Sequence, residues 1–358
     1  MKTPLFYHAE PMFGLDIGSQ SIKVMQLDQR QQHSVVTAYG TVRTDNKIMK
    51  DGVVTNIPET AKLIDYLLAN NLKGKLSTNR VVMGIPVSHV FTRVLTLPVM
   101  SKRELDSAVQ LEVEQSVPIP SKNLYFDYET TDIGEPDTML VRMVAAPRTI
   151  VDSYVAVCDL LGLDLALVQT NIRADAQLCL TYEEVSGRRP YIIIDVGGSS
   201  IDIGILDATL RLTGTVDEGG NSFTNAIKNE LKISHDQAHK IKVTKGIAAG
   251  KDQSKILHAV EPTLKKVVTE IRRMVRFYQE RINENSEISQ ILIVGGGANV
   301  PGFGDYLTNA TRIPTRVSSP WGERISFGKL EAPEFSDLPL FLTSAGLALA
   351  RENEALGL

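Results

Sequence analysis

The chain has 358 residues, of which 43% are hydrophobic and 22% are charged, and its formal net charge is -4. This composition is typical of a globular protein with two or three domains, and the small negative charge excludes a general attraction to nucleic acid or to anionic membranes. The two cysteines, Cys158 and Cys179, lie in apolar helical patterns without C-x-x-C spacing, so we expect buried, reduced thiols in a cytoplasmic protein.

No stretch of the sequence predicts direct membrane insertion. Residues 1–11 contain acidic and aromatic residues without a long apolar run, which argues against a signal peptide. The most apolar late segment, residues 338–350, is interrupted by polar residues and is too short to span a bilayer. We therefore expect any membrane association to depend on a partner.

Residues 13–42 predict a β-hairpin followed by a third strand. The stretch Gly14-Leu15-Asp16-Ile17-Gly18-Ser19-Gln20-Ser21-Ile22-Lys23 places an aspartate before a turn of small residues, after which the chain resumes as a strand. Backbone N–H groups of such a turn can converge on phosphate oxygens, because glycine permits a close approach. The aspartate beside the turn can hold a magnesium ion or its bound waters.

An inserted subdomain is predicted between residues 87 and 162. A helix from Pro58 and a strand at 80–86 precede it. Its expected elements are a strand at 90–97, a helix from the Ser101–Glu104 capping box to before Pro118, strands at 124–131 and 138–146, and a helix at 150–161 closed by Gly162. This order indicates a small α+β unit.

A second aspartate–glycine hairpin occurs about half a chain length after the first. A strand at 163–170, a helix at 174–184 and a polar link at 186–190 lead to it. Its sequence is Asp195-Val196-Gly197-Gly198-Ser199-Ser200-Ile201-Asp202, inside three strands predicted over 191–216. Two such copies predict a duplicated domain pair that faces one nucleotide.

Three helical patterns follow the second hairpin. Gly219-Gly220-Asn221 predicts a helix start, and Ser234 with Gln237 forms a further capping box. Residues 254–283 form a long amphipathic pattern in which we expect Pro262 to mark a break or a fresh start. Glu270 and Arg273 share one helix face, so they could contact a ribose and a base from one side.

A glycine triplet completes the pattern. Gly295-Gly296-Gly297-Ala298 follows the apolar strand 291–294 and precedes a helix expected from about Gly304. Consecutive glycines allow backbone to approach a base, sugar or phosphate, and the helix would offer its N-terminal amides. Taken alone the segment could be an ordinary loop, but its place after two hairpins favours nucleotide contact.

The hairpins, the Gly219-Gly220-Asn221 turn and Val294-Gly295-Gly296-Gly297 resemble the nucleotide-binding signature of the actin, Hsp70 and sugar-kinase superfamily. Within it the chain resembles the PilM family of type IV pilus assembly. This narrower resemblance is carried by the start of the first hairpin, by Leu97-Pro98-Val99-Met100-Ser101, by Val117-Pro118-Ile119-Pro120 and by the helix around Glu270.

The resemblance implies an α/β, actin-like, two-lobe fold, a duplicated ribonuclease H-like architecture with an inserted FtsA-type α+β subdomain in the first lobe. The implied division is 1–86 with 163–189 for the first lobe, 87–162 for the insert, 190–218 with 288–358 for the second lobe, and 219–287 for a helical subdomain. It also implies ATP with Mg²⁺ in the cleft. The implied partners are the cytoplasmic N-terminal tail of a PilN-like membrane protein and other pilus platform proteins.

The family pattern assigns residues to the nucleotide. The first phosphate loop would comprise Gly14, Asp16, Gly18, Ser19, Gln20, Ser21 and Lys23, and the second Asp195, Gly197, Gly198, Ser199 and Ser200. The nucleoside would contact Gly219, Gly220, Asn221, Glu270, Arg273, Gly295, Gly296, Gly297 and Ala298. Asp16, Asp195 and Asp202 would serve the metal, although Asp202 could equally be an exposed aspartate and Lys23 a surface lysine.

Hydrolysis would need a side chain that orients water toward the γ-phosphate. In this superfamily that residue comes from the segment after the insert, here residues 171–177, where Asp175 is the carboxylate and Gln177 the amide after the turn. Either could serve, so we expect ATP binding with slow hydrolysis at best, and ATP acting as a structural ligand or switch.

Three functions remain in competition. The first is an ATP-binding scaffold that recruits a peptide in a groove near the first lobe and its insert. Leu97, Pro98 and Pro118 could be neighbours of that groove, although ordinary turn and core packing also explains them. The second is an FtsA-like membrane filament, although residues 351–358 lack a basic amphipathic helix. The third is a small-molecule kinase, for which no catalytic carboxylate is evident. His235 and His239 have the spacing of a helical zinc pair but lack a third ligand, so we expect an exposed face.

Overall fold

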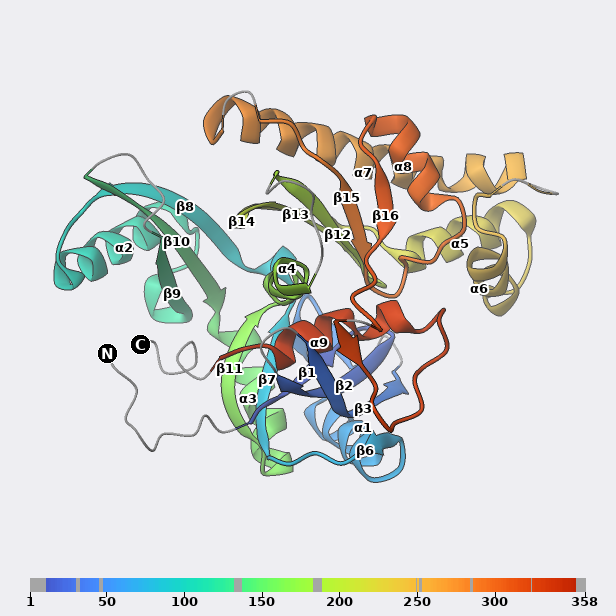
Figure 1. The fold of residues 1–358 in the computed structure, drawn as a ribbon, viewed down its shortest axis with the longest axis horizontal. Coiled ribbons are helices and arrows are strands. Elements are labelled where there is room, and N and C mark those ends of the chain that lie inside the picture. Colours follow the sequence, from blue (N-terminus) through green and yellow to red (C-terminus); the bar gives the residue numbers. More distant parts are fainter. Residues whose placement is uncertain are drawn as a thin grey trace.

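The computed structural model places two β-sheets one above the other, with an inserted subdomain at one side (Figure 1). It describes residues 11–29, 33–44, 48–131, 137–182, 189–248, 250, 253–283, 286–322 and 324–351. Most of the link expected at 186–190 and of the tail at 351–358 lies outside these residues. Among the helices of the described part, none is long and apolar enough to cross a membrane.

The first lobe is built on a seven-stranded sheet with the order β11-β7-β1-β2-β3-β17, in which β6 also pairs with β3. Its elements are β1 (Phe13–Ile17), β2 (Ser21–Gln29), β3 (Ser34–Arg43), β4 (Met49–Lys50), β5 (Val53–Val54), α1 (Ile57–Asn70), β6 (Leu72–Gly74), β7 (Arg80–Ile85), α3 (Arg148–Leu161) and β11 (Asp164–Thr170). The buried faces of α1 and α3 pack on this sheet and on each other.

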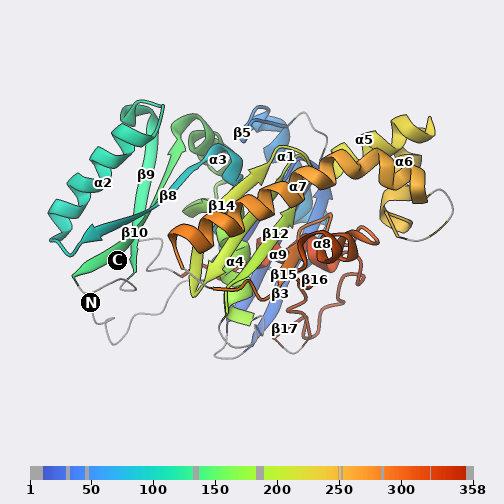
Figure 2. The ribbon, with the colours of Figure 1, turned by 90° about the horizontal axis from the view of Figure 1, so that it is seen from above.

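The second lobe is built on a five-stranded sheet with the order β14-β13-β12-β15-β16. Its elements are β12 (Tyr191–Val196), β13 (Ile201–Asp207), β14 (Thr209–Val216), α5 (Gly220–Leu231), α6 (His235–Thr244), α7 (Gln253–Arg281), β15 (Ile291–Val294), α8 (Phe303–Thr311) and β16 (Thr315–Val317). Helix α7 runs across the outer face of this sheet (Figure 2).

The two sheets repeat one topology. In each, two antiparallel pairings join three consecutive strands, and the first of these strands then pairs in parallel with a later one. A second parallel strand follows in both, β11 in the first sheet and β16 in the second. The predicted duplicated, actin-like α/β fold is therefore confirmed.

Helices α4 (Asn171–Tyr182) and α9 (Leu342–Ala348) lie between the sheets (Figure 1). Helix α4 contacts α9 and strands of both sheets, whereas α9 contacts β1, β2 and β7. One hydrophobic cluster accordingly contains Met25 of the first sheet, Ile193 of the second and Ala176 of α4. Apolar packing along these two helices holds the lobes together.

The inserted subdomain is smaller than the sequence predicts. Its three-stranded sheet, in the order β8-β10-β9, packs on α2 around Leu105, Val109 and Met143. Its elements are β8 (Phe91–Pro98), α2 (Lys102–Ser116), β9 (Leu124–Thr131) and β10 (Thr138–Pro147), with short 3₁₀ turns at Val87–His89 and Ser121–Asn123. Helix α3, expected to close the insert, packs instead on the first lobe, because its buried Tyr154 and Val157 fit that lobe's core.

The final segment also departs from the expected division. Residues 288–358 were assigned to the second lobe, but β17 (Ile325–Ser326) pairs with β3, and α9, preceded by a 3₁₀ turn at Leu338–Phe341, packs on the first sheet. The chain therefore crosses back to the first lobe. An apolar run alone does not specify which of two similar sheets it covers.

Pro262 does not break the helix, contrary to expectation. Helix α7 continues through it from Gln253 to Arg281. A proline inside a helix costs about 3 kcal/mol, but Val260 and Leu264 on either side are buried in the second lobe's core. This packing outweighs the local cost. Both predicted capping boxes, by contrast, are confirmed by their hydrogen bonds.

We expect Gly346→Ala to destabilise the junction of the lobes. A Cβ at Gly346 would lie 2.1 Å from the carbonyl oxygen of Ala174, so α9 and α4 would have to separate. Overpacking of this kind should lower the free energy of unfolding by about 1–3 kcal/mol, measured by urea denaturation. Gly250→Ala, at an open position, is the control and should change stability by less than about 0.5 kcal/mol. Equal stability of the two variants would contradict this packing.

Candidate functional site

The two glycine hairpins form the same turn. The N–H of Gly18 donates to the carbonyl of Ser21 at 3.0 Å, and the N–H of Gly197 donates to that of Ser200 at 3.0 Å. Each turn closes the end of an antiparallel pair, β1 with β2 and β12 with β13. The repeated sequence pattern therefore corresponds to repeated geometry.

The two turns face each other across the junction of the lobes. A Cβ added at Gly198 would lie 2.8 Å from Ser19 Oγ and 2.9 Å from Gln20 Cγ. A side chain at Gly198 would thus collide with the loop of the opposite lobe. The structure places both loops at one site, as the duplicated pattern predicts.

The Gly219-Gly220-Asn221 turn supports the second loop. The N–H of Gly220 donates to the carbonyl of Gly197 at 2.9 Å, and the N–H of Asn221 donates to that of Gly198 at 2.9 Å. The turn also begins α5, for which Gly219 is the N-terminal cap. These two amides fix the loop rather than face a ligand.

The glycine triplet reaches the same site. Gly295 has φ of +82°, and a Cβ there would lie 2.0 Å from Asp195 Oδ1. The N–H of Gly297 donates to the Val196 carbonyl at 2.9 Å, and Ala298 is buried behind it. The following helix, α8, begins at Phe303, close to the start predicted at about Gly304.

Lys23 and Asp202 occupy equivalent places in the two hairpins. Asp16 is opposite Lys23 in the register of the first hairpin, and Asp195 is opposite Asp202 in the second. Lys23 Nζ lies 2.8 Å from Asp16 Oδ2, and both side chains are largely buried. Neither Lys23 nor Asp202 is therefore a surface residue, and the alternatives left open by the sequence are excluded.

The second hairpin carries uncompensated acidity. Burial, then the charges of Asp202 and Asp16, raise the pKa of Asp195 to about 7, although Lys23 acts in the opposite direction. Burial also raises the pKa of Asp202 to about 6, while the Thr215 hydroxyl, which donates to it at 2.7 Å, acts to lower it. Two carboxyl groups in one buried pair thus repel each other.

Asp175, on α4, joins the same cluster. It is fully buried, and neither carboxylate oxygen meets the geometric limits of a hydrogen bond with the described residues. The Thr343 hydroxyl of α9 is nevertheless close enough to act to lower the pKa of Asp175. Burial and the charge of Asp195 raise its pKa well above the usual range. Gln177, the alternative residue, instead donates to the Leu349 carbonyl at 3.1 Å. Of the two, Asp175 is the one that the structure brings to the glycine loops.

The cluster suits a hydrated cation rather than a metal held by protein alone. In the described residues, no three His, Cys, Asp or Glu side chains converge on one ion position. Mg²⁺ commonly takes one or two carboxylates and keeps several waters. Asp16, Asp175, Asp195 and Asp202, with Lys23 bonded to Asp16, form an acidic group whose carboxylates can orient the waters of a hydrated cation.

Lys242 is a site residue that sequence reasoning missed. It is buried on α6, and its Nζ donates to the Gly220 carbonyl at 2.9 Å. Burial lowers its pKa to about 8. Lys242 lies four residues after the buried Ala238, and therefore on the same inward face of α6. This helical spacing is the feature of the sequence from which its burial could have been predicted.

Glu270 and Arg273 do not join the cluster. They pair with each other on α7, with Arg273 Nε 2.8 Å from Glu270 Oε2. Glu270 lies against Gly214 of β14, on the outer sheet face that α7 covers. Thr215 follows Gly214 on β14 and is opposite Asp202 on β13, to which its hydroxyl donates. Because successive strand residues point to opposite faces, Thr215 and Asp202 lie on the face away from Glu270. The sheet thus separates this pair from the aspartates.

A separate groove lies between the insert and the second lobe. Its volume is about 360 Å³, and it is lined by the start of β8, including Phe91 and Arg93, the end of α2 at Val117, and the middle of β14 around Gly214. Strands β8 and β14 are both sheet edges. Leu97, Pro98 and Pro118, named from the sequence as neighbours of a groove, do not line this one.

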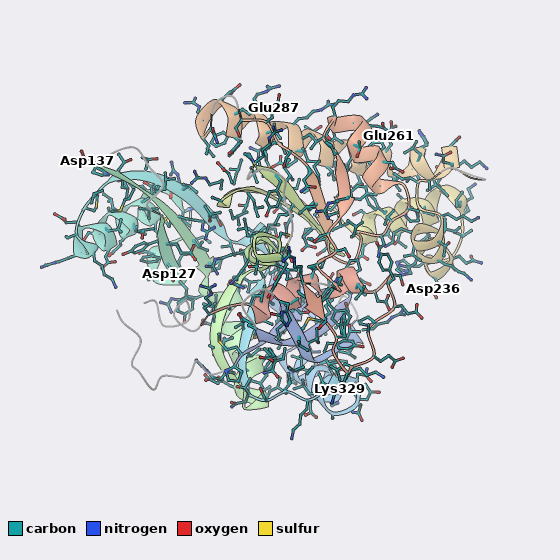
Figure 3. The ribbon with its side chains drawn as sticks, in the orientation of Figure 1. Asp127, Asp137, Asp236, Glu261, Glu287 and Lys329 are labelled. Carbon is teal, nitrogen blue, oxygen red and sulfur yellow. The ribbon has the colours of Figure 1, made fainter. Side chains whose placement is uncertain are left out.

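Exposed carboxylates contrast with the buried cluster. Figure 3 shows Asp236, Glu261 and Glu287 on the periphery of the second lobe. His235 lies 3.9 Å from Asp236, and both side chains are exposed. The expectation of an exposed histidine face on α6 therefore fits the structure.

A protein-family model and several known relatives match this chain over most of its length. The family described as type IV pilus assembly protein PilM matches residues 14–352. Cell division protein FtsA of Neisseria meningitidis serogroup B is 20% identical over 365 residues, covering 90% of this chain and 87% of the relative. FtsA of Streptococcus pneumoniae serotype 2 is 24% identical over 333 residues, covering 81% and 71%.

Solved structures support the same fold. A PilM–PilN type IV pilus biogenesis complex superposes with a TM-score of 0.80 at 22% identity, covering 96% of this chain and 98% of that one. MreB5 of Spiroplasma citri bound to AMPPNP superposes with a TM-score of 0.53 at 12% identity, covering 95% of each. The fold is that of actin-like proteins.

We expect Asp195→Asn to stabilise the nucleotide-free protein at neutral and higher pH. Between its usual pKa of 3.8 and the folded-state value of about 7, Asp195 binds more protons in the folded protein than in the unfolded chain. Its contribution to stability therefore falls as the pH rises through this window. The gain at pH 8 should be on the order of 2–4 kcal/mol and should vanish toward pH 4.

Thermal unfolding across this pH range measures the effect. Glu287→Gln, at an exposed position, is the control and should leave the pH profile unchanged. An Asp195→Asn variant that is less stable than wild type at every pH would contradict the repulsion between the buried aspartates.

Proposed function

Because the chain belongs to the PilM family of type IV pilus assembly proteins, we propose that it is an ATP-binding scaffold of the pilus machinery. In this proposal it acts at the cytoplasmic face of the inner membrane and binds the N-terminal tail of a PilN-like membrane protein. ATP with Mg²⁺ serves as a structural ligand or switch between the lobes.

One observation carries the nucleotide part of the proposal. Two glycine turns with the same hydrogen bond, one from each lobe, meet beside a cluster of buried aspartates whose pKa values are raised by burial and by one another's charge. Convergent backbone amides suit phosphate oxygens, and excess carboxylates suit a divalent cation. A triphosphate with its metal combines both requirements.

The residues take distinct roles in this proposal. The amides of residues 19–20 and 198–199 face the phosphates, since those of Gly18 and Gly197 are used within the turns, and Lys23, held by Asp16, adds a positive charge beside them. Asp16, Asp195 and Asp202 orient the waters of the metal, whose charge would neutralise the phosphates. Glycines 295–297 border the nucleoside side of the site. A ligand that contacts both turns stabilises the closed arrangement of the lobes.

Asp175 is the candidate for orienting a water toward the terminal phosphate. It is buried in the cluster, and its raised pKa favours a protonated carboxyl when no cation is near. A group in that state cannot accept a proton from water. In the proposal hydrolysis is slow at best, and bound ATP has a lasting, structural role.

The groove between β8 and β14 suits an extended peptide. Both strands present unpaired backbone groups at a sheet edge, and peptides commonly bind by adding a strand to such an edge. Apolar contacts come from Phe91 and Val117, and Arg93 adds a charge. The relative of known structure described above is a PilM–PilN complex. We therefore assign the tail of a PilN-like protein to this groove.

We expect Gly198→Val to weaken Mg-ATP binding at least tenfold, about 1.4 kcal/mol. The added side chain would occupy the space between the two turns, where Ser19 and Gln20 lie within 3 Å of a Cβ. Titration with a fluorescent ATP analogue measures the affinity. Glu270→Gln, on the outer face of the sheet, should bind like wild type. A wild-type protein without measurable affinity for Mg-ATP would refute the nucleotide part of the proposal.

We expect Thr213→Trp to abolish capture of a PilN-like tail. Thr213 lines the groove on β14, so an indole there would fill the path of the peptide. Pull-downs with a panel of short membrane-protein tails, with and without Mg-ATP, measure this. Thr209→Trp, at the start of the same strand and outside the groove, is the matched control. Undiminished capture by the Thr213 variant would place the tail elsewhere.

A further inference from the structure

Glu129 connects three parts of the molecule that are distant in sequence. It lies on β9 of the insert and accepts hydrogen bonds from Arg142 of β10 and from Arg173 of α4. The pair with Arg142 is internal to the insert, whereas the pair with Arg173 crosses to the helix between the lobes. Glu129 is thus a junction between the insert and α4.

Arg142 extends the connection to the second lobe. Its Nη1 donates to the carbonyl of Leu210, at the start of β14, at 3.2 Å. Arg173 also donates to Gln169, near the end of β11 in the first sheet. One charged network therefore touches the insert, both sheets and α4.

The network is partly withdrawn from water, which makes it sensitive to the loss of one member. The Arg142 and Arg173 side chains are only 14% and 21% exposed. Burial alone would raise the pKa of Glu129, but the two guanidinium groups outweigh it and lower the pKa below its usual value. Removing one partner of such a pair leaves the other charge desolvated and unpaired.

Helix α4 places this network next to the aspartate cluster. Arg173 is two residues before Asp175, within the first turns of the same helix. A helix moves as a rigid body, so a displacement of Asp175 toward or away from a ligand also displaces Arg173. The contact with Glu129 transmits that displacement to β9.

We propose that the Glu129 junction couples nucleotide binding between the lobes to the position of the insert, and hence to the width of the groove between β8 and β14. This inference rests on the proposed function, because it takes Mg-ATP as the ligand of the aspartate cluster. The groove has one wall on the insert and one on the second lobe, so a rotation of the insert changes its width. Coupling between two such sites is reciprocal, and a tail in the groove would strengthen nucleotide binding by the same factor.

Hydrogen–deuterium exchange on the full chain, with and without Mg-ATP, tests the coupling. In wild type we expect Mg-ATP to slow exchange in β9 and β10 as well as at the glycine turns. In Glu129→Gln we expect the slowing at the turns to persist and that in the insert to be lost. Arg173→Gln removes the α4 end of the network but keeps the Glu129–Arg142 pair, so it should give the same result if the first variant folds poorly.

Asp127→Asn is the matched control. Asp127 lies two residues before Glu129 on β9, on the outside of the insert (Figure 3), and its carboxylate accepts from the neighbouring Tyr128 N–H. This variant should keep the wild-type response of the insert. Slowed exchange in the insert of both network variants, or no response there in a wild-type protein that binds Mg-ATP, would overturn the coupling. A wild-type protein that shows no response at the turns would instead refute the proposed nucleotide site.

Discussion

Repulsion among buried carboxylates is the constraint around which the two lobes are arranged. Asp195, Asp202 and Asp175 are withdrawn from water, and the charge of Lys23 acts to lower the pKa of Asp195. Such an arrangement lowers the stability of the protein without a ligand, because ionised acids in a poorly solvated site cannot separate. In the proposed function, a bound cation relieves this repulsion.

The site is formed by two copies of one hairpin, and the two copies differ in charge at one equivalent position. The strands, the turn and the leading aspartate are repeated in both lobes, but the residue opposite that aspartate is Lys23 in the first hairpin and Asp202 in the second. The first hairpin is therefore close to neutral, whereas the second is strongly acidic. In the proposed complex, this difference directs phosphate toward the first loop and the metal toward the second.

Helix α4, between the lobes, connects the aspartate cluster to the inserted subdomain. Helix α4 carries Asp175 toward the cluster and Arg173 toward the insert, so the same short segment serves two regions. The groove is formed where two sheet edges approach. In the proposed function, binding at one of these two junctions alters the geometry of the other, so a partner is recruited without rapid catalysis.

The sequence by itself determined the hairpins, both capping boxes, the duplicated fold and the three strands and helix of the insert between residues 90 and 147, since each depends on residues that are close in the chain. Only the tertiary structure decided that α3 belongs to the first lobe, that α7 passes through Pro262, and that Glu270 lies behind the sheet rather than at the cluster. It also decided the positions of Asp175 and Lys242. Periodicity specifies which face of an element is buried, but the partner that covers that face depends on contacts between segments far apart in sequence.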